Sequence, residues 1–301
     1  MPTVNLVSRD NGVGLSTDMD LLETMLTGAG YDVQRVPWQQ RAMRRCDVAI
    51  FLELFNPRLV RHARHTVGIF NLEWFVPRWR SYLPRLTQLW AKSVDAHEAF
   101  GRLRLKSHLT GFMSRDLYDP AIERTPTCLH LKGHSDLKNT PAVLDAWARN
   151  PDLPSLTIIS QNPIPHPPPG VTVLGRLPLD ELRAHINRHQ IHVCPSRAEG
   201  WGHYITEGLS VGAAVVTTNA PPMSEHLTSD FGWLLPSTGQ HPRAWAVEHD
   251  VSADHIATAV REAAALTPDQ RDIVAKKARG SVADRNEQFR RTALSLLGRM
   301  L

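Results

Sequence analysis

Short runs of β-branched and other apolar residues alternate along the chain with longer segments whose apolar residues recur at helical spacing. This alternation is typical of α/β domains that are built around parallel sheets. In the first half it predicts strands at residues 3–8, 32–38, 47–54 and 66–74. It also predicts a helix over 21–30, with Gly28 or Gly30 as its C-cap, and a basic helix over 56–65.

The pattern of strands and helices restarts around residues 123–133. Further strands are predicted at 127–133, 156–161, 171–175, 191–196 and 213–219. Further helices are predicted at 139–150, 179–190, from 205 onward, and over the amphipathic segment 284–301. We therefore expect two α/β domains and a terminal helix that packs back on the first domain. The expected ranges are 1–124, 125–282 and 283–301.

Composition places the chain among soluble globular proteins, because 42% of its 301 residues are hydrophobic and 21% are charged. No apolar run approaches the ~18 residues that span a bilayer, and the first residues lack the order of a signal peptide. Cys46, Cys128 and Cys194 show no paired spacing, which favours reduced and mostly buried thiols. We expect a cytoplasmic protein.

The net charge of +4 is mild, but arginines gather in the first half of the chain. They are Arg35, Arg41, Arg44, Arg45, Arg58, Arg61, Arg64, Arg78, Arg80 and Arg85. A basic half suggests an anionic partner, such as phosphate groups, acidic glycans, a membrane surface or nucleic acid. Solvated helix faces explain the same arginines equally well.

Candidate chemistry lies directly after three of the predicted strands. The segments are RDNGVG at 9–14, LKGHSDLKN at 131–139 and SRAEGWGH at 196–203. In open parallel sheets, ligands bind in the crevice beyond the carboxyl ends of the strands. Their common position makes all three segments candidates for ligand binding.

The segment after strand 191–196 holds two glutamates around a glycine turn. Gly200 and Gly202 let the backbone approach a ligand closely, and a helix beginning near His203 would point its first amides at an anion. Glu199 lies at the entrance of this loop, and Glu207 lies in the first turns of the helix. A carboxylate near helical amides is also favourable structurally, so a capping role for either glutamate is an alternative.

Residues 193–225 resemble the donor-binding segment of the retaining GT-B glycosyltransferases of family four. The positions in register are Pro195, Ser196, Glu199, Gly200, Gly202, Glu207, Gly212, Val215, Val216 and Glu225. The resemblance implies the GT-B fold, an α/β fold in which two Rossmann-like domains face each other across a cleft.

The same resemblance implies a role for each part of the segment. Glu199 would contact the hydroxyls of the donor sugar, and Glu207 would hold the ribose hydroxyls. The turn between the glutamates would touch sugar or diphosphate through its backbone. The donor-binding positions of this turn are Gly200, Trp201, Gly202, His203 and Tyr204.

Family members also place a Gly-Arg pair and a later lysine around the donor diphosphate. Gly133 and Lys138 fit these places. Lys138 thus joins Glu199 as a catalytic candidate, because a diphosphate leaving group needs cationic stabilisation. The arginine is missing and the interval is one residue shorter than usual, so Lys132 or His134 would supply the missing charge.

Two more segments resemble the family less closely. Residues 171–182 match the family's segment that borders the nucleobase through its backbone, here near Gly175 and Arg176. A strand followed by a turn explains these residues equally well. In the first half, Gly12 and Gly14 follow the first strand and would let an acceptor or a phosphate approach.

Asn71 and Glu73 lie about where the family often has a His-containing loop, so no catalytic histidine carries over. Glu73 would orient an acceptor hydroxyl or simply pair with nearby arginines.

Two basic segments are candidates for acceptor recognition. One face of the predicted helix 56–65 carries Arg58, Arg61, His62 and His65. Residues 74–90 interleave aromatic side chains with arginines, which suits stacking on nucleic-acid bases or a membrane interface. The alternative for the second segment is an aromatic core with arginines at its rim.

As a whole, the resemblance implies a retaining, hexosyltransferase-type enzyme. It would move a sugar from a UDP- or GDP-linked nucleotide sugar to a hydroxyl acceptor of unknown identity. No cofactor is expected, and no His, Cys, Asp or Glu cluster has metal spacing. The expected acceptor is anionic: a glycan, a lipid phosphate or a nucleic acid.

Two alternatives remain open. One is the same chemistry on a modified base in DNA or RNA, as in phage-type enzymes. The other is a non-catalytic module that binds a nucleotide sugar.

Overall fold

The computed structural model describes residues 1–12 and 14–301. In it the chain forms two compact units, each built around its own six-stranded sheet. Unit 1 comprises Met1–Met113, Arg243–Ala246 and Arg285–Leu301. Unit 2 comprises Ser114–Pro242 and Val247–Asp284.

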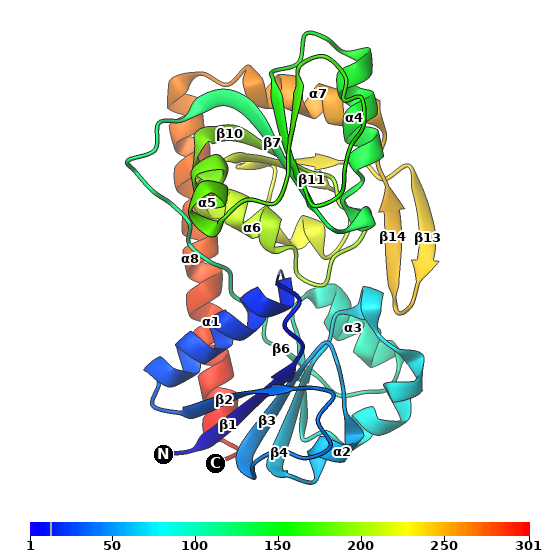
Figure 1. The fold of residues 1–301 in the computed structure, drawn as a ribbon, viewed down its shortest axis with the longest axis vertical. Helices are drawn as coiled ribbons and strands as arrows, with labels where there is room; N and C mark the ends of the chain where they lie inside the picture. The colour runs from blue at the N-terminus through cyan, green and yellow to red at the C-terminus, as the bar shows by residue number, and fades with distance from the viewer. Residues whose placement is uncertain (13) are drawn as a thin grey trace. The chain divides into compact units, whose positions relative to one another are not determined.

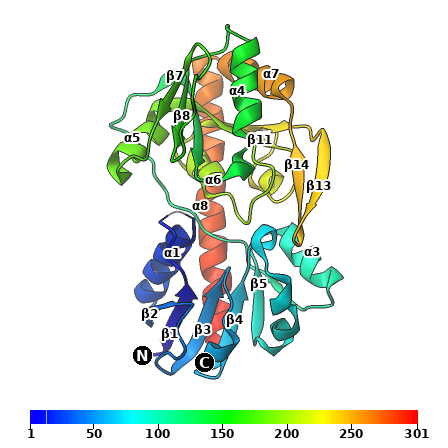
Figure 2. The same cartoon turned by 45° about the vertical axis from the view of Figure 1, so that its right-hand side comes forward.

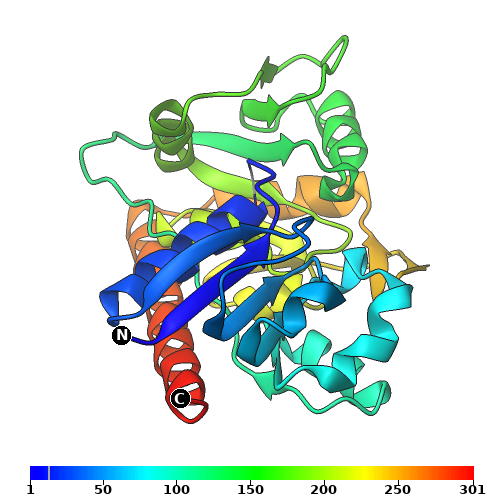
Figure 3. The same cartoon turned by 60° about the horizontal axis from the view of Figure 1, so that its bottom comes forward.

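The sheet of unit 1 is parallel between all neighbouring strands. Across the sheet, the strands are β2 (Asp32–Pro37), β1 (Thr3–Ser8), β3 (Cys46–Leu52), β4 (Ala63–Ile69), β5 (Gln88–Ala91) and β6 (His108–Leu109). The helices are α1 (Gly14–Gly28), α2 (Pro57–Val60), α3 (Val94–Arg102) and the 3₁₀ helices η1 (Leu72–Trp74) and η2 (Pro77–Arg85). Figure 2 shows β1, β3, β4 and β5 side by side, and in Figure 3 the blue helix α1 lies along the sheet.

The main sheet of unit 2 is also parallel between neighbours. Its order is β12 (Gly232–Leu235), β11 (Ala214–Thr218), β10 (His189–Cys194), β7 (Thr125–Gly133), β8 (Leu156–Ser160) and β9 (Val171–Leu174). A separate two-stranded sheet joins β13 (Gly239–Arg243) to β14 (Ala246–Asp250). The helices are α4 (Thr140–Arg149), α5 (Leu179–Arg188), α6 (His203–Ser210), α7 (Ala253–Ala264), α8 (Pro268–Gly298) and the 3₁₀ helices η3 (Asp136–Lys138) and η4 (Met223–His226), most of them labelled in Figure 1.

Two apolar clusters cover the two faces of the unit 2 sheet. Helices α4 and α7 pack on the face that presents Ile191 and Val193 of β10. Helices α5 and α6 and the first part of α8 pack on the face that presents Cys194. Successive side chains of a strand point to opposite faces, so Val193 and its neighbour Cys194 belong to different clusters. This three-layer arrangement leaves the loops at the strand ends as the places where ligands can reach the sheet.

Helix α8 is longer than the expected terminal helix over 283–301. It begins at Pro268, and its residues from Arg285 onward belong to unit 1. There Phe289, Ala293 and Leu297 are fully buried, and the ring of Phe289 lies 4.9 Å from that of Phe112. The predicted apolar side of this segment is therefore confirmed as a buried face.

The predicted basic helix over 56–65 is wrong. Helix α2 ends at Val60, and Ala63–Ile69 is strand β4, which lies in the middle of the sheet between β3 and β5. Thr66, Val67 and Ile69 are buried there, and tertiary pairing of these mostly β-branched residues overrides the helical spacing of the charged ones. Arg58, Arg61, His62 and His65 consequently do not share a helix face.

Residues 114–124 belong to unit 2, although we expected the second domain to begin at 125. Hydrogen bonds explain their place: the backbone N–H of Leu117 donates to Ser210 Oγ at 3.2 Å, and that of Asp119 donates to Asn187 Oδ1 at 2.8 Å. Side chains of unit 2 thus hold a segment that has no regular secondary structure. The pattern of apolar residues cannot predict such contacts.

Cys46, Cys128 and Cys194 are all free and buried. Burial raises the pKa of the Cys46 thiol to about 11 and raises the pKa of the other two further. Across the described parts of the chain, 1–12 and 14–301, no helix has the length and apolar character needed to cross a membrane.

Candidate functional site

The carboxyl edge of the unit 2 sheet gathers the residues that the sequence singled out in this half. Strand β10 ends at Cys194 and its neighbour β7 ends at Gly133, so the loops that follow them begin side by side. The backbone N–H of Arg197 in the first loop donates to Leu137 O in the second at 2.7 Å. This bond places Lys138, the next residue, against the loop that carries Glu199.

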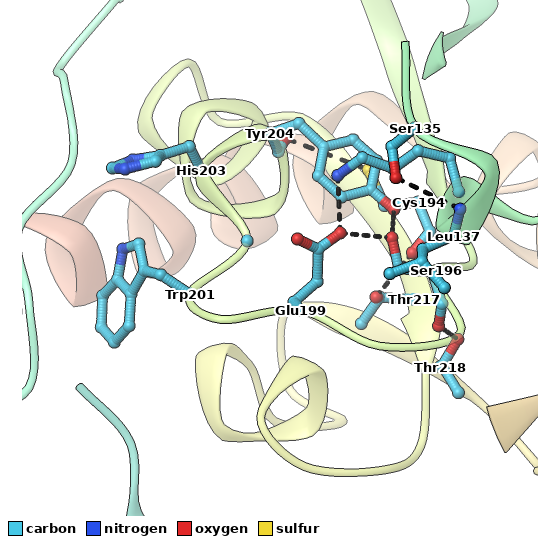
Figure 4. A network of polar contacts seen from close by, with 12 residues as sticks. Ser135, Leu137, Cys194, Ser196, Glu199, Trp201, His203, Tyr204, Thr217 and Thr218 are labelled. Atoms are coloured by element: carbon cyan, nitrogen blue, oxygen red, sulfur yellow. Dashed lines mark hydrogen bonds and ion pairs between the residues drawn. The ribbon is translucent and has the colours of Figure 1, made fainter. Parts of the chain in front are cut away.

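Glu199 forms the centre of a compact polar network (Figure 4). Its Oε1 lies 2.6 Å from Lys138 Nζ and 2.5 Å from Ser196 Oγ. Ser196 Oγ is hydrogen-bonded in turn to the hydroxyl of Tyr204. The Tyr204 ring lies beneath the Lys138 ammonium, 3.5 Å from centroid to Nζ. Lys138 and Ser196 thus both bond to one carboxylate oxygen, and Tyr204 contacts each of these two residues.

The second oxygen of Glu199 takes no part in this network. Oε2 accepts no hydrogen bond from any residue that the structure describes. The side chains of Lys138 and Glu199 are only 16% and 14% exposed, so both charges work in a partly desolvated setting. Electrostatic interactions are stronger there than in bulk water.

The turn between the two glutamates has the backbone shape that the sequence suggested. Gly202 caps α6 with φ +91°, a left-handed conformation that favours glycine. A Cβ on Gly202 would lie 3.1 Å from Ile205 Cδ1, which leaves little room for a larger residue. Helix α6 begins at the next residue, His203, and no side chain of a described residue caps it. Its first amides are therefore suited to an anion.

Buried hydrogen bonds hold this turn from behind. Trp201 Nε1 donates to Ser114 Oγ at 2.9 Å, and Ser114 Oγ is 2.6 Å from Thr206 Oγ1. The imidazole of His226 bonds to the carbonyl of Trp201, and Thr218 Oγ1 donates to Ser196 O at 2.6 Å. None of these supporting partners was singled out from the sequence.

Arg197 anchors the loop from the other side. Its guanidinium pairs with Glu248 at 2.9 Å and with Asp250 at 3.0 Å, both on β14. No sequence pattern indicates this pairing, because Glu248 and Asp250 follow the turn by about fifty positions and lie on strands that the apolar pattern does not predict.

Glu207 lies on the same helix as Tyr204 but outside the network. Its side chain is half-buried, and its carboxylate has no hydrogen-bond or ion-pair partner among the described residues. Burial raises the pKa of Glu207, while the nearby charges of His203, Arg115 and Lys138 act in the opposite direction. A half-buried carboxylate beside the glycine turn, with no partner among the described residues, is able to accept hydrogen bonds from a ligand.

The remaining positions singled out in this half follow other strand ends and do not join the Glu199 network. Gly133 has φ +56° at the end of β7, and His134 after it is exposed. The Lys132 side chain is 11% exposed, and its Nζ lies 3.6 Å from Asp136 Oδ1 with no hydrogen bond. Gly175 and Arg176 are exposed after the edge strand β9, and the structure does not join them to Glu199.

In unit 1, the expected residues also lie at the carboxyl edge of the sheet. Gly12 has φ +66° and its N–H donates to Asp10 and Ser16, while Gly14 begins α1. Val13 between them lies outside the described residues.

Asn71 follows β4 and leads to a residue that the sequence reasoning missed. Its Nδ2 donates to Glu53 Oε2 at 2.9 Å, and Glu53 lies 3.5 Å from Arg9. Glu53 is 7% exposed and has φ +58° directly after β3, and burial raises its pKa. Glu73 is buried in η1. The only sequence signal for Glu53 is a glutamate near the end of an apolar run, and the predicted strand over 47–54 includes it.

The aromatic residues of 74–90 belong mostly to the core. Phe75, Trp79 and Leu83 are buried in one cluster, and the Phe75 ring stacks on Trp245 at 3.7 Å. Arg78 and Arg80 between them are exposed, and so is Trp74 at the start of the segment. Phe75 and Trp79 are therefore unavailable for stacking on bases, and the core alternative holds for them.

Comparisons with known proteins extend this description. A family model described as glycosyl transferases group 1 matches residues 166–280. Sucrose-phosphate synthase from Thermosynechococcus elongatus superposes with a TM-score of 0.76 at 12% identity, over 100% of this chain and 99% of that one. HepE from Anabaena, in complex with UDP and glucose, gives a TM-score of 0.68 at 12% identity, over 99% of this chain and 100% of that one. The fold is GT-B.

A glycosyltransferase from Rickettsia africae superposes with a TM-score of 0.74 at 12% identity, over 99% of this chain and 98% of that one. No curated protein sequence matches the chain significantly. The family match and the GT-B fold together support a glycosyltransferase. The matched residues include Glu199 and Glu207, whereas Lys138 precedes them.

No group of three or more His, Cys, Asp or Glu side chains in the described parts of the chain is arranged to hold a metal ion.

Proposed function

We propose that this protein is a retaining glycosyltransferase of family four type, which transfers a hexose from a UDP- or GDP-linked nucleotide sugar to a hydroxyl acceptor. The observation that carries the proposal is the network of Lys138, Ser196 and Tyr204 around one oxygen of Glu199. It lies at the carboxyl edge of a parallel sheet, where this class of fold binds nucleotides. The match to group 1 glycosyl transferases over 166–280 and the UDP-bound state of HepE support the same reading.

Each part of the site has a proposed task. Glu199 accepts hydrogen bonds from the donor sugar through Oε2, while Oε1 stays fixed by Lys138 and Ser196. Glu207 accepts hydrogen bonds from the ribose. Lys138 and the first amides of α6 stabilise the negative charge that develops on the diphosphate.

The proposed reaction breaks the bond between the anomeric carbon and the diphosphate oxygen. The acceptor oxygen forms its bond to that carbon on the same face, which retains the configuration. The proton of the acceptor hydroxyl passes to the departing diphosphate, so no carboxylate nucleophile is required. We propose no cofactor for this step.

The proposed acceptor is anionic. Exposed arginines of unit 1 that form no ion pair with a described residue support this choice: Arg41, Arg45, Arg58, Arg61, Arg64, Arg78, Arg80 and Arg85. Acidic glycans, lipid phosphates and nucleic acids are the acceptors to compare.

The test is transfer and hydrolysis of radiolabelled UDP- and GDP-sugars by the wild type and by Glu199→Gln. The variant keeps the size of the side chain but loses the charge that pairs with Lys138. We expect turnover to fall by about 10²-fold or more, in line with the loss of one preorganised polar group. Glu181→Gln, an exposed glutamate on α5, is the matched control and should keep wild-type turnover.

Equal turnover in Glu199→Gln and in the wild type would contradict the assignment. Binding of a nucleotide sugar without transfer or hydrolysis, with all acceptor classes supplied, would favour a binding module.

A further inference from the structure

A cavity of about 370 Å³ lies at the opposite edge of the unit 2 sheet, where its central strands begin. Pro126, Ile191 and Ala214 line it from the starts of β7, β10 and β11. Most of the remaining wall is aliphatic and comes from the end of α7 and the start of α8. The Glu199 network lies beyond the carboxyl ends of the same strands, so the two places are separated by the length of the sheet.

Arg124 is the first of two arginines in this wall. Its Nη1 donates to the carbonyls of Val211 and Gly212 at 3.1 and 3.0 Å, where α6 ends. Its Nε is buried without a hydrogen-bond partner, and no carboxylate of a described residue pairs with it. Burial lowers the pKa of Arg124, as expected for a guanidinium that lacks an anion.

Arg271 is the second arginine. Its Nη1 donates to the neutral side chain of Gln190 at 2.7 Å, and its Nε is also buried without a partner. Asp272 lines the same cavity, but it is exposed and forms no ion pair with either arginine. The cavity therefore carries two guanidinium groups that no described carboxylate neutralises.

Both arginines are partly buried, and a charge that is withdrawn from water is unfavourable unless an opposite charge and hydrogen bonds accompany it. An oxyanion head group supplies both, because guanidinium N–H groups match the geometry of carboxylate and phosphate oxygens. The aliphatic wall favours an apolar body attached to that head. We infer that this cavity is a binding site for a small amphipathic anion, a carboxylate or phosphate monoester with a short aliphatic chain.

The probes for the test are hexanoate, hexyl phosphate and the uncharged hexanol, titrated calorimetrically into the full chain. We expect at least one anion to bind and hexanol to bind about tenfold or more weakly. Arg271→Met should weaken anion binding by about tenfold or more, because it removes the charge and keeps the aliphatic stem. Ala264→Phe should abolish binding by filling the cavity without changing any charge.

Controls separate this site from the donor site and from folding defects. Arg188→Met removes an exposed arginine of the same unit and should leave anion binding unchanged. Arg124→Met is avoided as the main variant, because Arg124 also holds the end of α6. Saturating UDP should leave the bound anion in place.

Three results would overturn the inference. They are the absence of binding by both anions, unchanged anion affinity in Arg271→Met and Ala264→Phe, and displacement of the anion by UDP. None of these readouts requires glycosyl transfer, so the inference stands or falls separately from the proposed activity.

Discussion

The hydroxyl of Ser196 sets the direction of every hydrogen bond in the Glu199 network. A serine hydroxyl has one proton, and an ionised carboxylate can only accept. Ser196 therefore donates to Glu199, and the Tyr204 hydroxyl donates to Ser196. Burial raises the pKa of Tyr204 well above its ordinary value, which keeps the phenol protonated for this role. The two hydroxyls form a relay that ends on the carboxylate.

This direction predicts unequal effects of two deletions. Tyr204→Phe removes a donor and keeps the ring under Lys138, and it should cost about 1 kcal/mol of unfolding free energy. Ser196→Ala leaves the buried Tyr204 hydroxyl without an acceptor and should cost roughly 2–3 kcal/mol. The double variant should be less destabilised than the sum of the two. Urea unfolding measures all three, and additive effects would contradict the relay.

The raised pKa of Glu207 predicts that the unfolding free energy changes with pH. Its raised pKa means that the folded protein holds this proton more tightly than the unfolded chain does. The stabilisation that this proton contributes is full below the pKa of Glu207 in the unfolded chain, and it is lost as pH rises through the pKa of Glu207 in the folded protein. Near neutral pH, Glu207→Gln should therefore raise the unfolding free energy by about 1 kcal/mol, or roughly 2–4 °C in Tm.

Near the ordinary pKa of a glutamate, this gain from Glu207→Gln should shrink. Glu262→Gln, on the exposed side of α7, is the control and should show no such pH dependence. A gain that is the same at both pH values would argue against a raised pKa.

Single residues of the proposed donor site could be anticipated because they follow one another in the chain. Glu199, Gly202 and Glu207 belong to one loop and one helix after a predicted strand. Glu53 could not be anticipated, because its place depends on a left-handed backbone angle and on partners from other strand ends.

At the scale of elements, Gly212 joins α6 to β11 under an unusual constraint. It has φ +72°, and a Cβ there would lie 2.8 Å from Ala275 Cβ on α8. Both the backbone angle and the contact therefore require glycine. The loop and the long helix can approach each other this closely only because the side chain is absent.

Gly212→Ala should consequently destabilise the protein by roughly 2–4 kcal/mol, combining a strained angle with overpacking. Gly280→Ala is the matched control, since Gly280 lies within α8 and a Cβ there meets nothing within 4 Å. That variant should gain about 0.5–1 kcal/mol from helix propensity. Thermal unfolding of both variants tests this difference, and equal Tm values would contradict the requirement for glycine at position 212.

Elements with a long apolar run were the predictable ones. Residues 3–8, 127–133 and 213–219 each overlap a strand of the structure. The helix over 56–65 failed because charged residues at helical spacing occur in strand β4, whose buried positions are β-branched. The pair β13 and β14 has few apolar residues, so its stability depends on tertiary partners such as Arg197.

At the scale of the whole molecule, buried histidines tie stability to pH. Burial lowers the pKa of His130 to about 4, that of His189 to about 4 and that of His192 to about 3. The folded state thus favours their neutral forms. Their contribution to stability is present above the ordinary histidine pKa and is lost as pH falls toward the folded values.

The unfolding free energy should therefore decline steeply below pH 6.5, by on the order of 3 kcal/mol for His130 alone at pH 4. His130→Gln should reduce the slope of the unfolding free energy against pH by the contribution of about one bound proton. His108→Gln changes an exposed histidine and should leave the slope unchanged. Stability measured by urea unfolding across this pH range tests the point, and a flat profile for the wild type would refute it.

The buried cysteines offer a further use at this scale. Cys46 lies in unit 1, and Cys128 and Cys194 lie in unit 2. The thiolate is the reactive form of cysteine, and burial raises the pKa of all three thiols. Alkylating reagents should reach each thiol only when its surroundings open. The rate at which each cysteine is alkylated therefore reports how often its surroundings open, separately for unit 1 and unit 2. Mass spectrometry of the alkylated peptides measures these rates.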